Sequence, residues 1–178
     1  MGPHLGHPAA TYWRLNMSNL DQLGLKAKFH KAGEAQLADG VLNRLEAVAA
    51  FDLEDTLNAA VQEGELDANQ TESAGNEFKR FLALTLLARH GVGDVEQRIA
   101  GPSPVVDAVW HECLDDEDGY KALCDDVLGF HLGHGVDLEN TPEPESSQPM
   151  VDLLTEFFVT HDAAAWSGNL ASCWPVIR

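Results

Sequence analysis

Asp107 and His111 stand four residues apart in the segment "VVDAVWHECLDDEDGYKALC", which covers residues 105–124. On a helix, this spacing puts both side chains on the same side. The carboxylate can then accept a hydrogen bond from one imidazole nitrogen, which leaves the other nitrogen free to bind a metal ion or to act as a base. The pair therefore predicts a small chemical site, and the alternative is an ordinary polar pair at the edge of a core.

Cysteine and histidine, the side chains that zinc prefers, recur around this pair. The next helical segment holds a cysteine, and "GFHLGH" after it holds two histidines three residues apart. The spacings match no standard zinc-finger pattern. The donor types nevertheless predict one site for zinc or another transition metal, either structural or catalytic. The expected ligands are His111, Cys113, Cys124 and His134, and the expected neighbours are Asp107 and Tyr120.

Two of the candidate donors depend on the local backbone. Cys113 lies roughly 200° around an ideal helix from His111, so the two can share an ion only if the helix ends or distorts between them. A free cysteine is also a common small apolar core residue. His131 and His134 are compatible with one face of a turn, with the alternative that His131 is a surface residue.

Other reaction templates are missing from the sequence. There is no G-x-S-x-G elbow and no glycine-rich phosphate loop, and "WHEC" lacks the second histidine of an H-E-x-x-H motif. The acidic run at residues 115–118 lacks the alternating carboxylates of an EF-hand loop, so we expect a solvated turn. A thiol enzyme that uses Cys113 or Cys124 as its nucleophile stays an alternative without a recognised pattern.

The chain of 178 residues carries 11 basic and 29 acidic side chains, a formal net charge of −18. Such a surface repels nucleic-acid phosphates and anionic lipid, and it suits a metal-free accessory module with a basic protein partner. A salt-adapted host would also produce it. No apolar run approaches the roughly 20 residues of a bilayer span, and no secretory pattern opens the chain, so the expected compartment is the cytoplasm. The three cysteines are expected to be thiols or metal ligands.

Apolar residues recur at helical spacing through most of the chain. The pattern predicts helices near residues 37–49, 53–63, 77–90, 104–114, 119–128 and 150–166. The segment "EFKRFLALTLLARHG" is apolar around most of its circumference, which indicates a central buried helix. The remaining segments are expected to be a flexible leader (1–16), a polar loop (65–76), an acidic, proline-rich connection (137–149) and an irregular tail (167–178).

Residues that cap helices support these limits. Asp52, Ser103 and Pro104 suit helix starts, and Gly64 and Gly91 suit helix ends. Alternating apolar residues are nearly absent, so the sequence predicts no clear strand. The expected fold class is all-α, a compact single-domain helical bundle of five or six helices over residues 17–178 with irregular termini.

Three segments, "FKRFLAL", "PSPVVDAVWHECLDDEDGYKALC" and "GFHLGH", resemble the glycine-rich domain-containing protein-like family of bacteria and plants. The resemblance covers residues 77–134, about a third of the chain. The matching positions are Val106, Asp107, Trp110, His111, Tyr120, Cys124, Gly129 and His134.

The resemblance implies a helical domain with Asp107, His111 and Cys124 in one cluster. It implies no reaction, because the family's biochemical role is poorly defined. The chain departs from the family pattern at two positions. Cys113 stands where the family has a second histidine, and Gly133 stands where it has the first of two paired histidines.

Overall fold

Helices form most of the structure, as the apolar periodicity predicts. The computed structural model describes residues 19–29, 37–136 and 146–177, so the expected leader and most of the acidic connection lie outside the described residues. The helices within these ranges are α2 (Asn19–Leu23), η1 (Ala27–Phe29), α3 (Asp39–Ala50), α4 (Glu54–Glu63), α5 (Thr71–Arg89), α6 (Val95–Arg98), α7 (Pro104–Asp115), α8 (Glu117–Ala122), η2 (Leu123–Leu128) and α9 (Gln148–Phe157). The all-α fold class is confirmed, with a short two-stranded sheet added.

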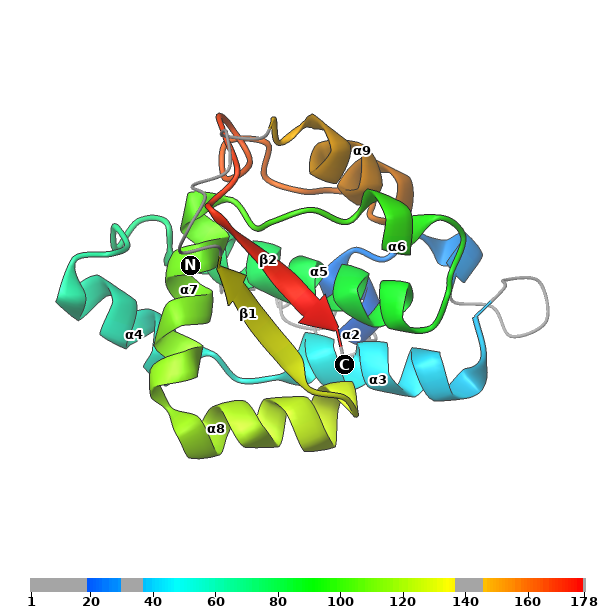
Figure 1. The fold of residues 1–178 in the computed structure, drawn as a ribbon, viewed down its shortest axis with the longest axis horizontal. Coiled ribbons are helices and arrows are strands. Elements are labelled where there is room, and N and C mark those ends of the chain that lie inside the picture. The colour runs from blue at the N-terminus through cyan, green and yellow to red at the C-terminus, as the bar shows by residue number, and fades with distance from the viewer. Residues whose placement is uncertain (1–18, 30–36, 137–145, 178) are drawn as a thin grey trace, which may run out of the picture.

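Helix α5 lies at the centre of the molecule, and α3, α6 and α7 pack against it (Figure 1). Almost all its side chains from Glu77 to Ala88 are buried, on every side of the helix, which confirms the prediction of a central buried helix. The buried apolar residues form one continuous core. None of the helices in the described ranges is both long and apolar enough to cross a bilayer.

The sequence indicates Asp52 as the N-cap of α4, but Leu53 takes that position. The other indicated capping residues stand at the helix ends where the sequence puts them. The Asp52 carboxylate accepts a hydrogen bond at 2.9 Å from the first N–H group of α4. Ser103 Oγ accepts one at 3.3 Å from the Val106 N–H in the first turn of α7. Gly64 and Gly91 follow α4 and α5 with φ angles of 82° and 64°, left-handed conformations that glycine adopts without strain.

Helix α5 begins at Thr71, although the sequence predicts a loop as far as residue 76. Its first turns are polar, so no apolar period reveals them. Contacts with a distant segment hold them instead, since Ser73 Oγ donates a hydrogen bond to Asp162 Oδ2 at 2.5 Å and Ala74 is fully buried. Tertiary packing here overrides a weak local preference.

Helix α9 is shorter than predicted and begins earlier. It starts at Gln148, inside the segment predicted as a connection, and it ends at Phe157 rather than near residue 166. The chain leaves the helix because Phe158 takes an extended conformation and forms a β-bridge with Leu25. This bridge joins the C-terminal part of the chain to the segment after α2.

Two strands, β1 (Leu132–Val136) and β2 (Cys173–Ile177), form an antiparallel ribbon, so the prediction that the chain has no strand is wrong. Figure 1 shows the ribbon beside α7 and across α5. The sequence hides it because β1 contains two glycines and β2 a proline, residue types that are depleted in strands. The tail is irregular as predicted only as far as residue 172.

Candidate metal site

Helix α7 presents Asp107 and His111 at the border of its buried face. The buried face of α7 is formed by Val106, Val109, Trp110 and Cys113. Asp107 and His111 each follow directly after a residue of this buried face, and their side chains are 19% and 57% exposed. Asp107 Oδ1 lies 3.7 Å from His111 Nε2, so the predicted pair is confirmed as two neighbours on one side of the helix.

His134 reaches the same place from strand β1. Side chains alternate along a strand, so His134 points to the same side as the buried Leu132, and its own side chain is only 13% exposed. His131 lies just before the strand and is exposed. The two histidines therefore do not share one face, because this segment is a strand rather than a turn.

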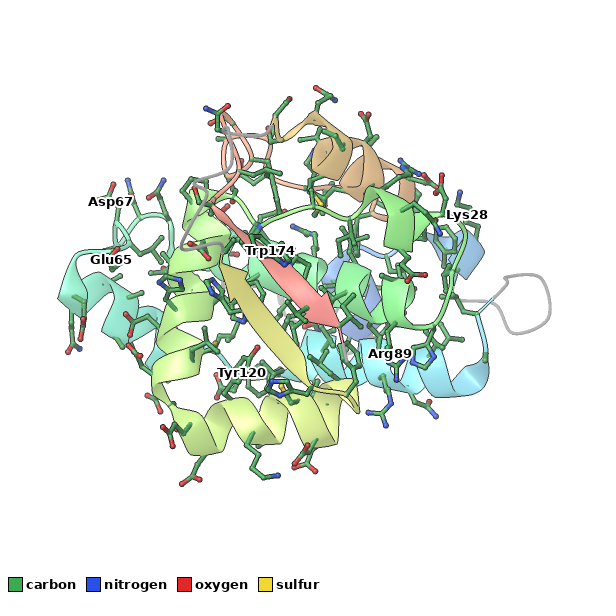
Figure 2. All side chains as sticks on the ribbon, viewed as in Figure 1. Lys28, Glu65, Asp67, Arg89, Tyr120 and Trp174 are labelled. Carbon is green, nitrogen blue, oxygen red and sulfur yellow. The ribbon has the colours of Figure 1, made fainter. Side chains whose placement is uncertain are left out.

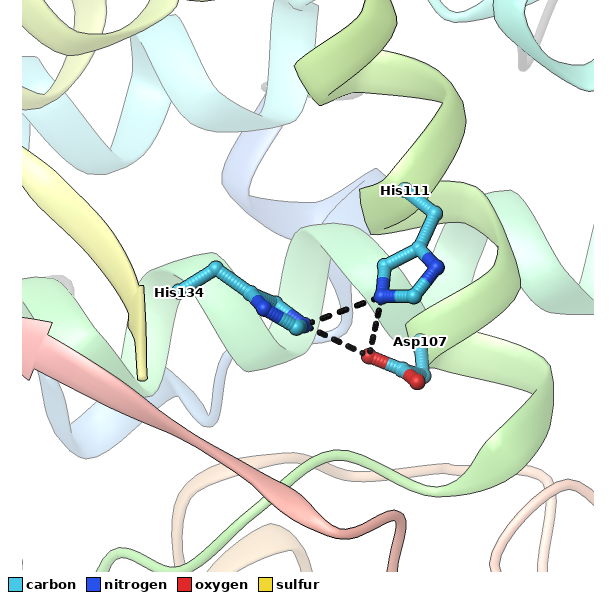
Figure 3. Close-up of side chains that lie close together, drawn as sticks. All are labelled: Asp107, His111 and His134. Carbon is cyan, nitrogen blue, oxygen red and sulfur yellow. Dashed lines mark hydrogen bonds and ion pairs between the residues drawn. The ribbon is translucent and has the colours of Figure 1, made fainter. Parts of the chain in front are cut away.

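The side chains of Asp107, His111 and His134 converge on one point (Figure 3). His134 Nε2 lies 3.1 Å from Asp107 Oδ1 and 3.1 Å from His111 Nε2. The two imidazole rings are 4.7 Å apart between centroids, at an interplanar angle of 67°. Among the described residues, this is the group of histidine, cysteine and acidic side chains that could hold a metal ion.

The triangle of donor atoms is small enough to hold a metal ion, and zinc serves as a scale for its edges. Zinc forms bonds of roughly 2.0–2.1 Å with imidazole nitrogen and carboxylate oxygen, which places the ligands of a tetrahedral ion roughly 3.3 Å apart. The three edges here are 3.1, 3.1 and 3.7 Å. A point between the three atoms lies about 1.9 Å from each of them, close to the length of such a bond.

His134 Nε2 lies within hydrogen-bond distance of both Asp107 Oδ1 and His111 Nε2, and it can form a full two-centre hydrogen bond with only one of them at a time. One imidazole Nε2 carries either one proton or one lone pair. If His134 Nε2 donates to Asp107, it has no lone pair for His111, and if it accepts from His111, its lone pair faces the carboxylate. A cation between the three atoms satisfies every contact at once, because each atom then directs a lone pair at the ion.

The indole of Trp110 and the hydroxyl of Tyr120 hold β1 against α7 and α8. Trp110 Nε1 donates to Tyr120 Oη at 2.9 Å, and that hydroxyl donates to the Leu132 carbonyl at 2.5 Å. The Trp110 ring also meets the His134 ring edge-on, with centroids 4.7 Å apart. Figure 2 shows Tyr120 at the end of the ribbon where β1 begins. Tyr120 therefore acts on His134 through the position of the strand.

The structure does not bring Cys113 or Cys124 into the cluster. Helix α7 runs without a break to Asp115, so Cys113 faces the other side of the helix, where it contacts Thr56 and lines a separate pocket of about 180 Å³. Cys124 is buried against Tyr120 and the backbone of Leu132. The observed group of donor atoms includes Asp107, which the sequence predicts only as a neighbour of the ligands. It includes neither Cys113 nor Cys124.

The three cysteines do not have the properties of nucleophiles. Burial raises the pKa of Cys113 to about 12, and it also raises the pKa values of Cys124 and Cys173. A reactive cysteine needs a depressed pKa, because the thiolate is the nucleophile. The geometry therefore gives no support to the thiol enzyme that the sequence leaves open.

Cys173, at the start of β2, is a neighbour of the cluster that the sequence analysis missed. Its Sγ lies 3.0 Å from Asp107 Oδ1, and the residue is buried. The contact joins positions 66 residues apart, and no local pattern announces it. The available signal was the residue type itself, a third cysteine in a chain that already offers zinc donors.

Comparisons of the chain with protein-family models, with curated proteins and with solved structures find no match.

Proposed function

We propose that this protein binds one divalent transition-metal ion, with zinc as the first candidate, through Asp107 Oδ1, His111 Nε2 and His134 Nε2. The observation that carries the proposal is the size of the donor triangle, whose edges of 3.1, 3.1 and 3.7 Å fit an ion at ordinary bond lengths. One carboxylate and two imidazoles suit zinc, iron or a similar ion better than calcium or magnesium, which prefer oxygen ligands.

The exposure of His111 supports an ion with an open coordination position. Asp107 and His134 are mostly buried, whereas the His111 side chain is 57% exposed. Three protein ligands leave at least one position for water, as catalytic zinc sites do. A metal ion with such a position can acidify the bound water or polarise a substrate oxygen. The proposed role is therefore a metal centre accessible from solvent rather than a closed structural site.

The resemblance to the glycine-rich domain-containing protein-like family stays a prediction. It implies that Cys124 shares a cluster with Asp107 and His111, and the donor group does not contain Cys124. All three proposed ligands are matched positions. The two departures, Cys113 and Gly133, lie outside the donor triangle. Cys113 lines another pocket, and a Cβ built on Gly133 would lie 3.3 Å from Val176, on the opposite side of β1 from His134.

Metal content and affinity test the proposal directly. Protein purified without an affinity tag and loaded with zinc is expected to hold one equivalent, and the double substitution His111→Ala with His134→Ala is expected to abolish this binding. His131→Ala is the matched control, because this exposed histidine lies only three residues from His134. The control, like the double variant, retains His4 and His7, which could bind stray metal. Equal zinc binding by the double variant and the wild type would overturn the proposal.

The predicted basic partner of the acidic surface remains a second hypothesis. The net charge of −18 favours such a partner. In this hypothesis the protein is a metal-free accessory module, so one equivalent of zinc bound through His111 and His134 would count against it.

A further inference from the structure

The contact between Cys173 and Asp107 has a place in the proposed metal site. Cys173 Sγ donates a hydrogen bond to Asp107 Oδ1 at 3.0 Å. This is the same carboxylate oxygen that faces both imidazoles, at 3.1 and 3.7 Å. A thiol hydrogen bond to this oxygen fixes the rotation of the carboxylate, and therefore decides which oxygen points at the histidines.

The backbone at Cys173 is held by the segment that leads into α7. The Ala171 N–H donates to the Pro102 carbonyl at 2.8 Å. A Cβ on Gly101 would lie 2.3 Å from the Cys173 carbonyl oxygen, so this close approach requires glycine. Asp107 lies in the first turn of α7, directly after this segment. The segment that leads into α7 therefore fixes the positions of both the Cys173 thiol and the Asp107 carboxylate.

The sulfur itself lies outside the set of donor atoms. Asp107, His111 and His134 offer ligand atoms that are all within 4.8 Å of one another, and that group does not include Cys173. As placed, Sγ contacts a ligand of the ion rather than the ion. Carboxylates that bind metals are commonly held by such hydrogen bonds, and loss of one typically weakens metal binding roughly 10–100-fold.

We infer that Cys173 is a positioning residue of the metal site: its thiol orients the Asp107 carboxylate toward the two imidazoles and does not bind the ion. The inference rests on the proposed function. It assigns the third cysteine a role in metal affinity, although the sequence pattern singles out the other two. The role needs a hydrogen-bond donor at position 173, and serine can supply one.

Cobalt(II) titration followed by absorption spectroscopy separates this role from the alternatives. The proteins compared are the wild type, Cys173→Ala, Cys173→Ser and the control Cys113→Ala, which removes an equally buried thiol that faces away from the site. Circular dichroism confirms that each variant is folded. We expect wild-type cobalt binding without a thiolate-to-cobalt charge-transfer band. Cys173→Ala should bind roughly 10–100-fold more weakly, while Cys173→Ser and Cys113→Ala stay close to the wild type.

Each other outcome has a definite meaning. A charge-transfer band that disappears in Cys173→Ala makes the thiol a ligand and overturns the positioning role, while the metal site stands. Unchanged affinity in Cys173→Ala also overturns the role, because the hydrogen bond then has no effect on the site. Equal weakening in the alanine and serine variants shows that sulfur itself is needed and likewise contradicts it. Absence of cobalt binding by the wild type defeats the proposed function as well.

Discussion

His134 Nε2 lies 3.1 Å from Asp107 Oδ1, although His134 belongs to strand β1 and Asp107 to helix α7. The candidate site therefore exists only where the ribbon packs on the helix. Helix α7 alone supplies two donors, and the ribbon supplies the third. Changes that shift the ribbon should weaken metal binding even where the helices remain folded.

Asp107→Asn tests the need for an anionic donor. Asparagine keeps the size of the side chain and removes its charge, so zinc affinity should fall more than about 10-fold, while the fold is retained. Isothermal titration with zinc measures the change. Asp115→Asn is the control, because Asp115 is exposed at the end of the same helix, and it should bind zinc as the wild type does. Unchanged affinity in Asp107→Asn would remove the carboxylate from the proposed ligands.

Tyr120→Phe tests how β1 is held. The substitution deletes the hydroxyl that accepts from Trp110 Nε1 and donates to the Leu132 carbonyl. It leaves the Trp110 indole N–H and the Leu132 carbonyl without this partner, which should lower the free energy of unfolding by about 1–3 kcal/mol. Zinc affinity should fall too, because Leu132 starts the strand that carries His134. Urea denaturation and zinc titration measure the two effects, and a loss of stability with full zinc affinity would contradict the link between Tyr120 and the site.

Gly101→Ala tests the close approach between the segment that leads into α7 and strand β2. A Cβ at this position would lie 2.3 Å from the Cys173 carbonyl oxygen, and the backbone must move to admit it. The expected cost is about 1–3 kcal/mol of stability, together with weaker zinc binding. Gly40→Ala is the matched control, because Gly40 lies in α3 with no atom near the added Cβ. That control should be neutral or stabilising by up to about 1 kcal/mol. Equal effects of the two substitutions would contradict the packing described here.

The buried thiol of Cys113 predicts a loss of stability at alkaline pH. Burial raises the pKa of Cys113 from 9.0 to about 12 in the folded state, so the unfolded state releases this proton first as the pH rises. The contribution of the Cys113 thiol to stability is complete below pH 9 and declines between pH 9 and pH 12. Between pH 8 and pH 10, the wild type should lose about 1.4 kcal/mol more than Cys113→Ala does. Urea denaturation at both pH values measures this difference. Equal losses of stability in the two proteins would show that folding does not raise the pKa of the Cys113 thiol.

Most of the longer helices and half of the site could be predicted from the sequence because they depend on local patterns. Ser103 and Pro104 mark the start of α7, and the four-residue spacing of Asp107 and His111 puts both on one side of it. The expected 200° separation of Cys113 from His111 also agrees with the structure, since α7 continues past both residues. Local spacing is sufficient wherever one helix fixes the geometry.

The other half of the site depends on contacts that no local pattern reveals. His134 meets the helix because "LGHGV" pairs with "CWPVI", and the glycines and the proline in these segments do not indicate strands. The predicted ligand set joins His111 with His134 and with the thiols of Cys113 and Cys124. The structure brings His134 to His111 from β1, and it leaves Cys124, which lies on η2 after α8, outside the group. Cys173 is brought in by the same unpredicted ribbon.

Anomalous X-ray diffraction at the zinc edge, from crystals of tag-free protein grown with one equivalent of zinc, would locate the ion relative to the three proposed ligands. We expect one strong peak, roughly 2.0–2.2 Å from Asp107 Oδ1, His111 Nε2 and His134 Nε2. Absence of a peak between these three atoms, or a zinc ion bound only at other histidines, would contradict the proposed metal site.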